Sequence, residues 1–203
     1  MYNPNHFKET GQTRLHDFIQ QNSFGLLVSQ VDGKPFASHL PLLLDRQSGP
    51  QGCVIGHMAR ANPQWQQAEG QEVLVVFSGP HAYISPAWYE AEQVVPTWNY
   101  VAVHVYGRLK IIQEQNALVR IVQDSVAFYD QSWSLDGPKD FMERMVRMIV
   151  GFRIQIERME GKWKLNQNHP RERREKVIQA LRGRTDENSK LIAELMDETL
   201  ESE

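Results

Sequence analysis

Four short segments carry the residues of this chain that could bind a ligand. Each lies at or near the end of an apolar, β-rich run, where a strand would leave a barrel, and each holds polar or aromatic side chains there. Such side chains supply hydrogen-bond donors, acceptors and flat aromatic faces to a common site. The segments are residues 38–41, 56–63, 79–86 and 96–100.

Segment 56–63 has the pattern of an anion site. A strand ends at His57, Arg60 follows in a turn, and a helix is expected to begin at Asn62 or Pro63. Free backbone N–H groups at a helix start and the fork of guanidinium donors both favour a phosphate, and His57 adds another donor. An ordinary capped helix with an exposed arginine would have the same pattern.

Two further segments suit a flat ligand. Pro41 cannot donate to a β-ladder, so segment 38–41 marks an edge, a bulge or a place that faces a ligand. Residues 97–99 supply a hydroxyl, an indole face and a carboxamide immediately before a strand. The alternatives are a hydrogen-bonded barrel histidine at His39 and a tryptophan that closes the barrel end at Trp98.

The spacing of the histidines argues against a metal site. His39, His57, His81 and His104 lie on or near predicted strands, but the chain has no His-x-His pair and no His-Glu-x-x-His motif. It also lacks the Gly-x-Gly-x-x-Gly, Walker and Gly-x-Ser-x-Gly motifs, so no Rossmann unit is expected. Cys53 is the only cysteine and lies in an apolar run, where we expect a buried hydrophobe.

Length and composition fit one soluble domain. Of the 203 residues, 41% are hydrophobic and 23% are charged, and no apolar run is long enough to span a membrane. The first residues resemble no signal peptide, so we expect a cytoplasmic protein without membrane contact. Residues 171–184 hold six basic and two acidic residues, and residues 185–203 hold seven acidic residues and one basic residue. These two segments could pair with each other, with a partner subunit or with a polyanion such as DNA.

Strands dominate the predicted fold and position the four segments. Apolar runs 24–31 and 35–44 flank Asp32-Gly33, a dipeptide typical of a tight hairpin. Further strands are predicted over 52–57, 72–78, 100–112 and 151–160, the last followed by a turn at Gly161. Helices are predicted over 13–21, 115–129 and 139–150 and from 171 onward, with Phe141, Met145, Met148 and Ile149 on the apolar face of 139–150. These elements predict an antiparallel barrel decorated with helices.

The four segments, in this order, resemble the motifs of the PaiB family, the FMN-binding negative transcriptional regulators of bacteria. The similarity covers nearly the whole chain and includes residues 1–7 and 162–168, although Asn166 stands where the family usually has serine. It implies a mainly β, α+β fold: an antiparallel split β-barrel of the pyridoxamine-phosphate-oxidase-like type with C-terminal helices. It also implies one FMN-binding domain over 1–170, with 171–203 as a helical tail of the same structural unit.

The resemblance further implies a homodimer that binds FMN in clefts between its subunits. Arg60, His57 and the amides near Ala61 and Asn62 would hold the phosphate, segment 38–41 would lie along the isoalloxazine, and residues 97–99 would flank the ring or the ribityl chain. The last three residues of the predicted set would come from the second subunit. The set is Ser38, His39, Leu40, Pro41, His57, Met58, Arg60, Ala61, Asn62, Thr97, Trp98, Asn99, Lys164, Gln167 and Asn168.

Three functions stay open at this point, and no catalytic residue is identified. The first is a flavin-sensing regulator that represses transcription directly or through a partner, in which 171–184 either contacts DNA phosphates or is a solvated helix. The second is an FMN-dependent oxidoreductase or flavin reductase in which His81, Tyr83 or Trp98 positions a small aromatic substrate. The third is a split barrel that binds haem through a barrel histidine.

Overall fold

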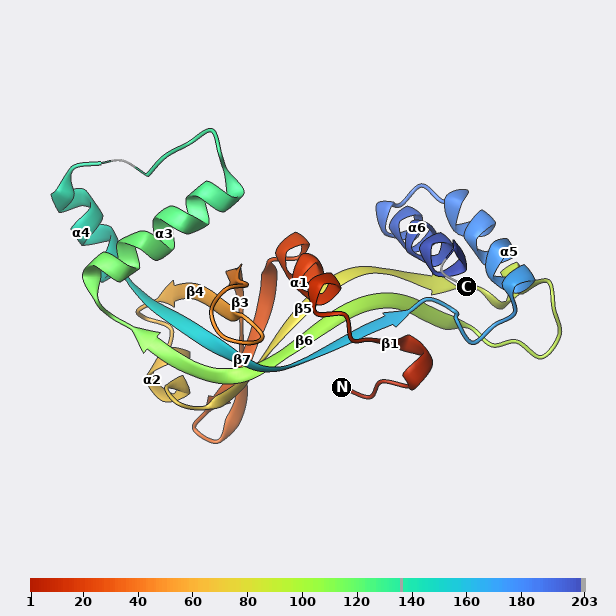
Figure 1. Ribbon diagram of the computed structural model, residues 1–203, viewed down its shortest axis with the longest axis horizontal. Coiled ribbons are helices and arrows are strands. Elements are labelled where there is room, and N and C mark those ends of the chain that lie inside the picture. Colours follow the sequence, from red (N-terminus) through yellow and green to blue (C-terminus); the bar gives the residue numbers. More distant parts are fainter. Residues whose placement is uncertain (136, 202–203) are drawn as a thin grey trace. The chain divides into compact units, whose positions relative to one another are not determined.

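Seven strands form one sheet in the computed structural model, which describes residues 1–135 and 137–201 (Figure 1). Their order is β1-β7-β4-β3-β2-β5-β6, and an additional pairing of β6 with β7 closes all but β1 into a barrel. The predicted antiparallel split barrel is therefore confirmed. The strands are β1 (Lys8–Glu9), β2 (Phe24–Val31), β3 (Lys34–Asp45), β4 (Cys53–Ala59), β5 (Glu72–Ile84), β6 (Thr97–Ile112) and β7 (Ile149–Lys164).

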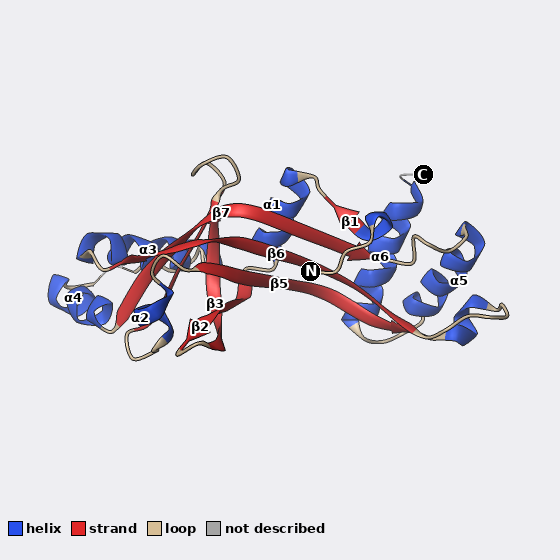
Figure 2. Cartoon of the chain, turned by 90° about the horizontal axis from the view of Figure 1, so that it is seen from below, coloured by secondary structure: helices blue, strands red, loops and turns tan. Residues whose placement is uncertain are grey.

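Helices lie outside the strands (Figure 2). Helix α3 contacts β3 and β4, α4 packs against α3, and α5 and α6 pack against each other. Within residues 1–135 and 137–201, no helix is long and apolar enough to cross a membrane. The helices are η1 (Asn5–Phe7), α1 (Gln12–Gln21), α2 (Gln64–Ala68), η2 (Pro86–Tyr89), α3 (Gln115–Tyr129), α4 (Lys139–Arg147), α5 (Arg171–Arg182) and α6 (Glu187–Glu201).

The chain divides into two compact units. The barrel unit comprises Gln12–Phe77 and His104–Met159. The terminal unit comprises Met1–Gly11, Ser78–Val103 and Glu160–Glu203. Helices α5 and α6 therefore group with the N-terminal residues and with the ends of β5, β6 and β7. The division at residue 170 that the sequence suggests stays a prediction.

The hairpin of β2 and β3 forms where the sequence predicts it. Asp32 and Gly33 have φ angles of 51° and 70°, the positive values that a two-residue hairpin turn of this twist requires. The register pairs Val31 with Lys34 and continues to Phe24 with Pro41. Alternate residues then point inward. The inward residues form the core of the barrel unit, in which Leu27, Val54, Val75, Phe77, Val105 and Phe152 are fully buried.

The predicted turn at Gly161 is wrong. Strand β7 continues through this residue to Lys164. Gly161 pairs with Glu9, and Lys162 pairs with Lys8, so β1 extends the strand from the far end of the sequence. A glycine in an apolar run indicates a turn only when no neighbouring strand offers backbone partners to it.

The apolar face predicted for the helix over 139–150 is also wrong. Helix α4 ends at Arg147, and its buried side chains are Met142 and Val146. Phe141 and Met148, by contrast, are 48% and 70% exposed. The apolar residues that follow the helix belong to β7, which starts at Ile149. The predicted apolar face therefore combined residues of a helix, whose side chains repeat every 3.6 residues, with residues of a strand, whose side chains alternate.

Gly107 allows β6 to approach β7 closely enough to close the barrel. A Cβ atom at this position would lie 2.1 Å from the carbonyl oxygen of Gln155 and 2.9 Å from its carbonyl carbon. Both atoms are backbone, so the contact could be relieved only by moving a strand of the closed sheet. A Cβ atom at Gly70 would meet nothing within 4 Å. A side chain there would be unfavourable only because the φ angle of this residue is positive, +73°.

Gly107→Ala is expected to lower the free energy of unfolding by about 3 kcal/mol or more, because the clash falls on backbone that cannot give way. Gly70→Ala, the matched control, should lose only about 1 kcal/mol. Urea unfolding of both variants measures the difference. Equal losses would mean that close approach at Gly107 does not limit barrel closure.

Candidate functional site

Nine of the predicted FMN-binding residues lie in the barrel unit, on β3, on β4 and in the loop before α2. The two strands are neighbours, since Leu42 pairs with Gly56. The segments that adjoin this pair are linked by Asn62, whose Nδ2 donates to Ser38 Oγ at 2.9 Å. Its Oδ1 accepts from the backbone N–H of Gln64, also at 2.9 Å. The structure thus brings segments 38–41 and 57–62 together.

Segment 38–41 lies where β3 changes partner. Pro41 is opposite Phe24 at the start of β2, and the next residue, Leu42, donates its N–H to Ser23 and pairs with β4. Proline, which has no backbone N–H, is tolerated where a strand passes from one partner strand to the next. His39 is exposed, and its ring stacks 6.1 Å from the ring of Phe24. Leu40 is a buried core side chain, so it would offer a ligand only its backbone.

Met58 and Ala61 contribute little side-chain chemistry to this half of the set. Met58 is 2% exposed and belongs to the core, whereas Ala61 is exposed. Helix α2 that follows them has only five residues, so its dipole adds little to the attraction for an anion. Any phosphate here depends mainly on side-chain donors.

Arg60 already binds three acceptors of the barrel unit. Its Nε donates to the carbonyl of Arg147 and its Nη2 to the carbonyl of Ile149, both at 2.8 Å. Its Nη1 donates to Gln113 Oε1 at 3.2 Å. A guanidinium has five N–H donors, so two remain for a ligand. Arg60 therefore braces the end of β4 against the start of β7, whatever else it binds.

His57 holds a buried polar atom that lacks a partner. Its Nδ1 has no hydrogen bond within the part of the chain that the structure describes. Burial lowers the pKa of His57 below its usual 6.5, so the imidazole is neutral at physiological pH. An unsatisfied buried nitrogen is uncommon in folded proteins, and it is suited to a hydrogen bond with a bound ligand.

The other six predicted residues lie in the terminal unit, where Lys164 is hydrogen-bonded to two of the others. Its Nζ donates to Thr97 Oγ1 and, at 2.5 Å, to the carbonyl of Trp98. Burial, and then the charge of Lys162, lower the pKa of Lys164 below its usual 10.5. None of the described residues gives this half-buried cation a carboxylate partner. Lys164 therefore fits an anionic group such as a phosphate.

Asn99, Gln167 and Asn168 have different surroundings. Asn99 is fully buried, and its Nδ2 contacts Met196 Sδ at 3.3 Å, while its Oδ1 has no partner among the described residues. Gln167 closes a local turn, in which its Nε2 donates to the carbonyl of Trp163 and its Oε1 accepts from Leu165 N–H. Asn168 is exposed. Gln167 thus has a structural task that its position in the sequence does not reveal.

Sequence reasoning missed two basic side chains near Lys164, Lys162 and His169. Lys162 is 7% exposed and donates to the carbonyl of Tyr2 at 2.9 Å. The ring of His169 stacks on Tyr89 at 4.8 Å, and burial, Arg173 and Lys164 lower the pKa of His169. Lys162 and Lys164 alternate along β7, a signal that becomes visible only once the strand is extended past Gly161.

Comparison with known proteins shows the family to which this chain belongs. The family model described as "Putative FMN-binding domain" matches residues 1–158. A relative from Bacillus subtilis (strain 168), "Protease synthase and sporulation protein PAI 2", is 39% identical over 210 residues, which is 100% of both chains. The chain belongs to the PaiB family. It is an FMN-binding protein of the PaiB type, as the motifs in the sequence predict.

Two solved structures share the fold of this PaiB protein. The flavocytochrome Anf3 from Azotobacter vinelandii superposes with a TM-score of 0.59 over 77% of this chain and 69% of its own, at 12% identity. The FAD and haem binding protein from Mycobacterium smegmatis gives a TM-score of 0.58 over 77% and 73%, also at 12% identity. At this identity the similarity concerns the fold alone.

The lowered pKa of His57 predicts a pH dependence of stability. Between that lowered pKa and 6.5 the unfolded chain binds more protons than the folded one, so stability falls as the pH falls through this range. In His57→Gln, the free energy of unfolding should depend less on pH over this range. In His39→Gln, at an exposed histidine, the pH dependence should stay as in wild type. Urea unfolding of the FMN-free protein at about pH 7.5 and about pH 5.5 tests this. An unchanged slope in His57→Gln would refute it.

Proposed function

We propose that this PaiB protein is an FMN-binding regulator that acts as a homodimer. The observation that carries the flavin site is Lys164, a half-buried cation that donates to the neutral oxygens of Thr97 and Trp98 and has no carboxylate partner among the described residues. The buried Nδ1 of His57, which has no hydrogen bond within the described part of the barrel unit, supports it. Both features are costly in a protein that binds nothing at these places.

In this proposal Lys164, Gln167 and Asn168 are supplied by the second copy of the chain, together with Thr97 and Trp98, to which Lys164 is hydrogen-bonded. The two uncommitted donors of Arg60 and the amides near Ala61 would bind the phosphate. Segment 38–41 would lie along the ring, and His57 would hydrogen-bond to the cofactor. When bound, FMN supplies hydride and single-electron transfer, and the protein residues hold and orient it.

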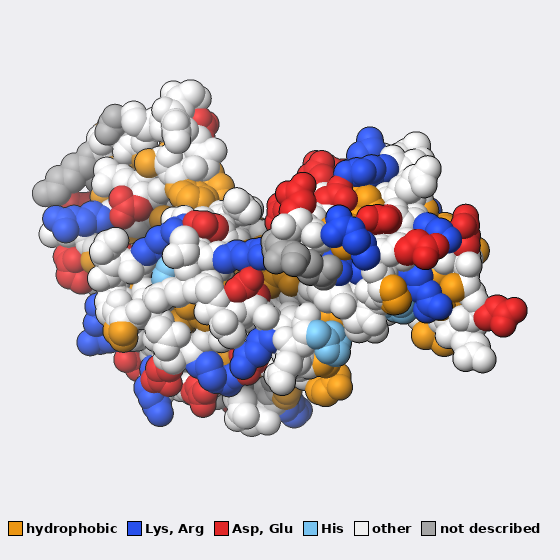
Figure 3. All heavy atoms as spheres, turned by 45° about the vertical axis from the view of Figure 1, so that its right-hand side comes forward, with side chains coloured by type: hydrophobic (Ala, Val, Ile, Leu, Met, Phe, Trp, Pro, Cys, Tyr) orange, Lys and Arg blue, Asp and Glu red, His pale blue; other side chains and the backbone are white. Residues whose placement is uncertain are grey.

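The basic helix α5 gives no support to direct DNA contact. Arg171 pairs with Glu175 at 3.0 Å, Lys176 pairs with Glu172 at 3.1 Å, and Arg182 pairs with Asp197 of α6. Arg174 is 1% exposed and donates to Thr199 Oγ1. On the face shown in Figure 3, acidic and basic side chains are interspersed over these helices. We therefore propose that regulation works through a partner, and DNA contact by α5 stays a prediction.

The outer face of the barrel unit supports the homodimer. Leu26 pairs with Val76, and Val28 pairs with Leu74, and all four side chains are half-exposed. The alternate residues of the same strands point into the core, so β2 and β5 are apolar on both faces. An antiparallel sheet that meets water on one side normally has polar residues there. This face is therefore suited to burial against another surface.

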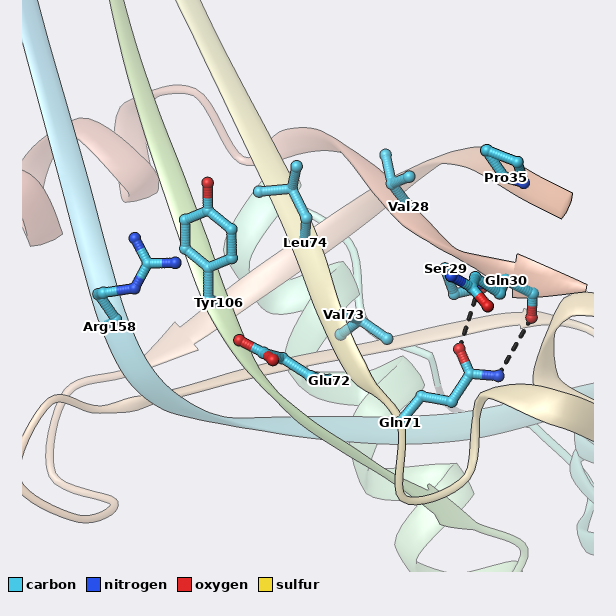
Figure 4. Close-up of a pocket in the computed structure, with 10 residues that line it drawn as sticks. All are labelled: Val28, Ser29, Gln30, Pro35, Gln71, Glu72, Val73, Leu74, Tyr106 and Arg158. Atoms are coloured by element: carbon cyan, nitrogen blue, oxygen red, sulfur yellow. Dashed lines mark hydrogen bonds between the residues drawn. The ribbon is translucent and has the colours of Figure 1, made fainter. Parts of the chain in front are cut away.

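A hollow of about 560 Å³ on this face suits a second copy of the chain (Figure 4). Val28, Leu74 and Tyr106 line it, together with Glu72 and Arg158. The guanidinium carbon of Arg158 lies 3.7 Å from the centroid of the Tyr106 ring. A two-fold contact would bury the apolar members of this lining against the same surface of a second copy.

Lys164→Met is expected to weaken FMN binding by about 10- to 100-fold, because a charge-assisted hydrogen bond to the phosphate is lost. Lys110→Met, at an exposed lysine of β6, is the matched control and should leave the affinity unchanged. Flavin fluorescence titrations measure both. Equal affinity of Lys164→Met and wild type would remove Lys164 from the site.

Binding of a phosphate would also raise the lowered pKa of Lys164. Above about pH 7, where the FMN phosphate is a dianion, the affinity of wild type should therefore fall as the pH rises towards 10.5, and Lys164→Met should lack this fall.

In the same preparations, steady-state oxidation of reduced nicotinamide by the FMN-loaded protein would favour a flavin reductase, and a Soret band in the absorbance would favour haem.

Val28→Asp is expected to raise the dimer dissociation constant at least tenfold, because it places a charge in the apolar contact. The matched control is Val95→Asp, at a valine that is 74% exposed in the terminal unit. Analytical ultracentrifugation over a range of concentrations measures both. A wild-type monomer at all concentrations, or a dimer unaffected by Val28→Asp, would refute the proposed interface.

A further inference from the structure

A cavity of about 260 Å³ lies beside Trp98 in the terminal unit. His81 and Tyr83 of β5 and Trp98 of β6 form its aromatic wall, and Arg184, Asp186 and Ser189, around the start of α6, form its polar wall. None of these residues except Trp98 belongs to the predicted FMN set. The cavity therefore combines flat apolar surface with charge outside most of that set.

The aromatic wall is unusually open. Trp98 is 54% exposed and Tyr83 is 46% exposed, and their rings meet edge to face at 5.9 Å. The ring of His81 lies 6.2 Å from that of Trp98. The same histidine and tryptophan also line a second cavity, of about 320 Å³. Large aromatic side chains that gather on a surface without being packed are typical of a binding site.

The polar wall selects the charge of the ligand. Asp186 Oδ1 accepts from Ser189 N–H, and Asp186 Oδ2 accepts from Ser189 Oγ and from Arg184 Nε, each at 2.9 Å. Both carboxylate oxygens are therefore occupied, and they cap α6. Hydrogen bonds from the side chain and backbone of Ser189, and then from Arg184, lower the pKa of Asp186 to about 2.

Arg184, in contrast, keeps its terminal amino groups available. Its Nε is used by Asp186 and, at 3.1 Å, by Ser189 Oγ. In the described part of the chain no acceptor binds its Nη1 or Nη2. These two groups carry four N–H donors in a plane, an arrangement that matches a carboxylate. The cavity thus offers donors to an anion, whereas the oxygens that a cation would need are taken.

We propose that this cavity binds a small planar aromatic acid, with its ring against Trp98 and Tyr83 and its carboxylate on the terminal amino groups of Arg184. The cavity is smaller than the roughly 300 Å³ at which sites for drug-sized ligands begin, so one or two fused rings fit it. This ligand differs from FMN in size and, apart from Trp98, in the residues that bind it. A PaiB protein with both sites would respond to the acid as well as to its flavin.

The test is isothermal titration calorimetry of the FMN-saturated protein with 4-hydroxybenzoate and 1-naphthoate, and with the neutral amide of each as the matched ligand. At least one acid should bind, and its amide should bind at least tenfold more weakly, because the charge-assisted pair with Arg184 is lost. No heat from either acid at about 10 mM, or equal binding of acid and amide, would overturn the proposal.

Variants separate the two walls of the cavity. Arg184→Gln should weaken binding of the acid at least tenfold, whereas Arg182→Gln, which removes an arginine paired with Asp197, should not. Trp98→Leu should also weaken it, and because Trp98 is exposed this change does not depend on refolding of a core. Unchanged binding in both Arg184→Gln and Trp98→Leu would refute the site. Binding only to FMN-free protein would assign the cavity to the flavin site and likewise overturn a separate one.

Discussion

Closure of the barrel between β6 and β7 is the constraint on which the rest of the structure depends. It requires that two backbones approach at Gly107 more closely than any side chain would permit. Strand β7 then serves three neighbours, because it also pairs with β4 and with β1. Arg60 is braced against its first residues, and Lys162 and Lys164 project near its last. Strand β7 therefore supports Arg60 at its start and carries Lys164 at its end.

Local chemistry made much of this fold predictable. Asp32-Gly33 fixes the hairpin because these residue types tolerate positive φ, and α3 begins where Glu114 accepts from the N–H groups of Asn116 and Ala117. The link between Ser38 and Asn62 joins two segments that the motifs single out, one in β3 and one in the loop after the neighbouring strand β4. In each case the decisive interaction lies within the segment or between adjacent strands.

Features that depend on distant partners were not predictable in the same way. The passage of β7 through Gly161 depends on β1, more than a hundred residues earlier in the chain. The hydrogen bonds of Arg60 depend on the carbonyls of Arg147, at the end of α4, and of Ile149, at the start of β7, whereas a sequence pattern shows only that an arginine follows a strand. The basic side chains near Lys164, which are Lys162, His169 and Arg173, come from a strand end, a turn and a helix. Their grouping is a property of the folded chain and not of any one segment.

The hydrogen bonds of Arg60 have a consequence for ligand affinity. A flexible loop that closes around an anion must lose conformational entropy at the moment of binding, and this loss reduces the affinity. In the barrel unit the loop after β4 is ordered by hydrogen bonds that Arg60 and Asn62 make to the protein itself. The conformational entropy of this loop is therefore lost when the protein folds and not when a ligand binds. The loop is preorganised, so a ligand that binds there loses less affinity to ordering of the chain.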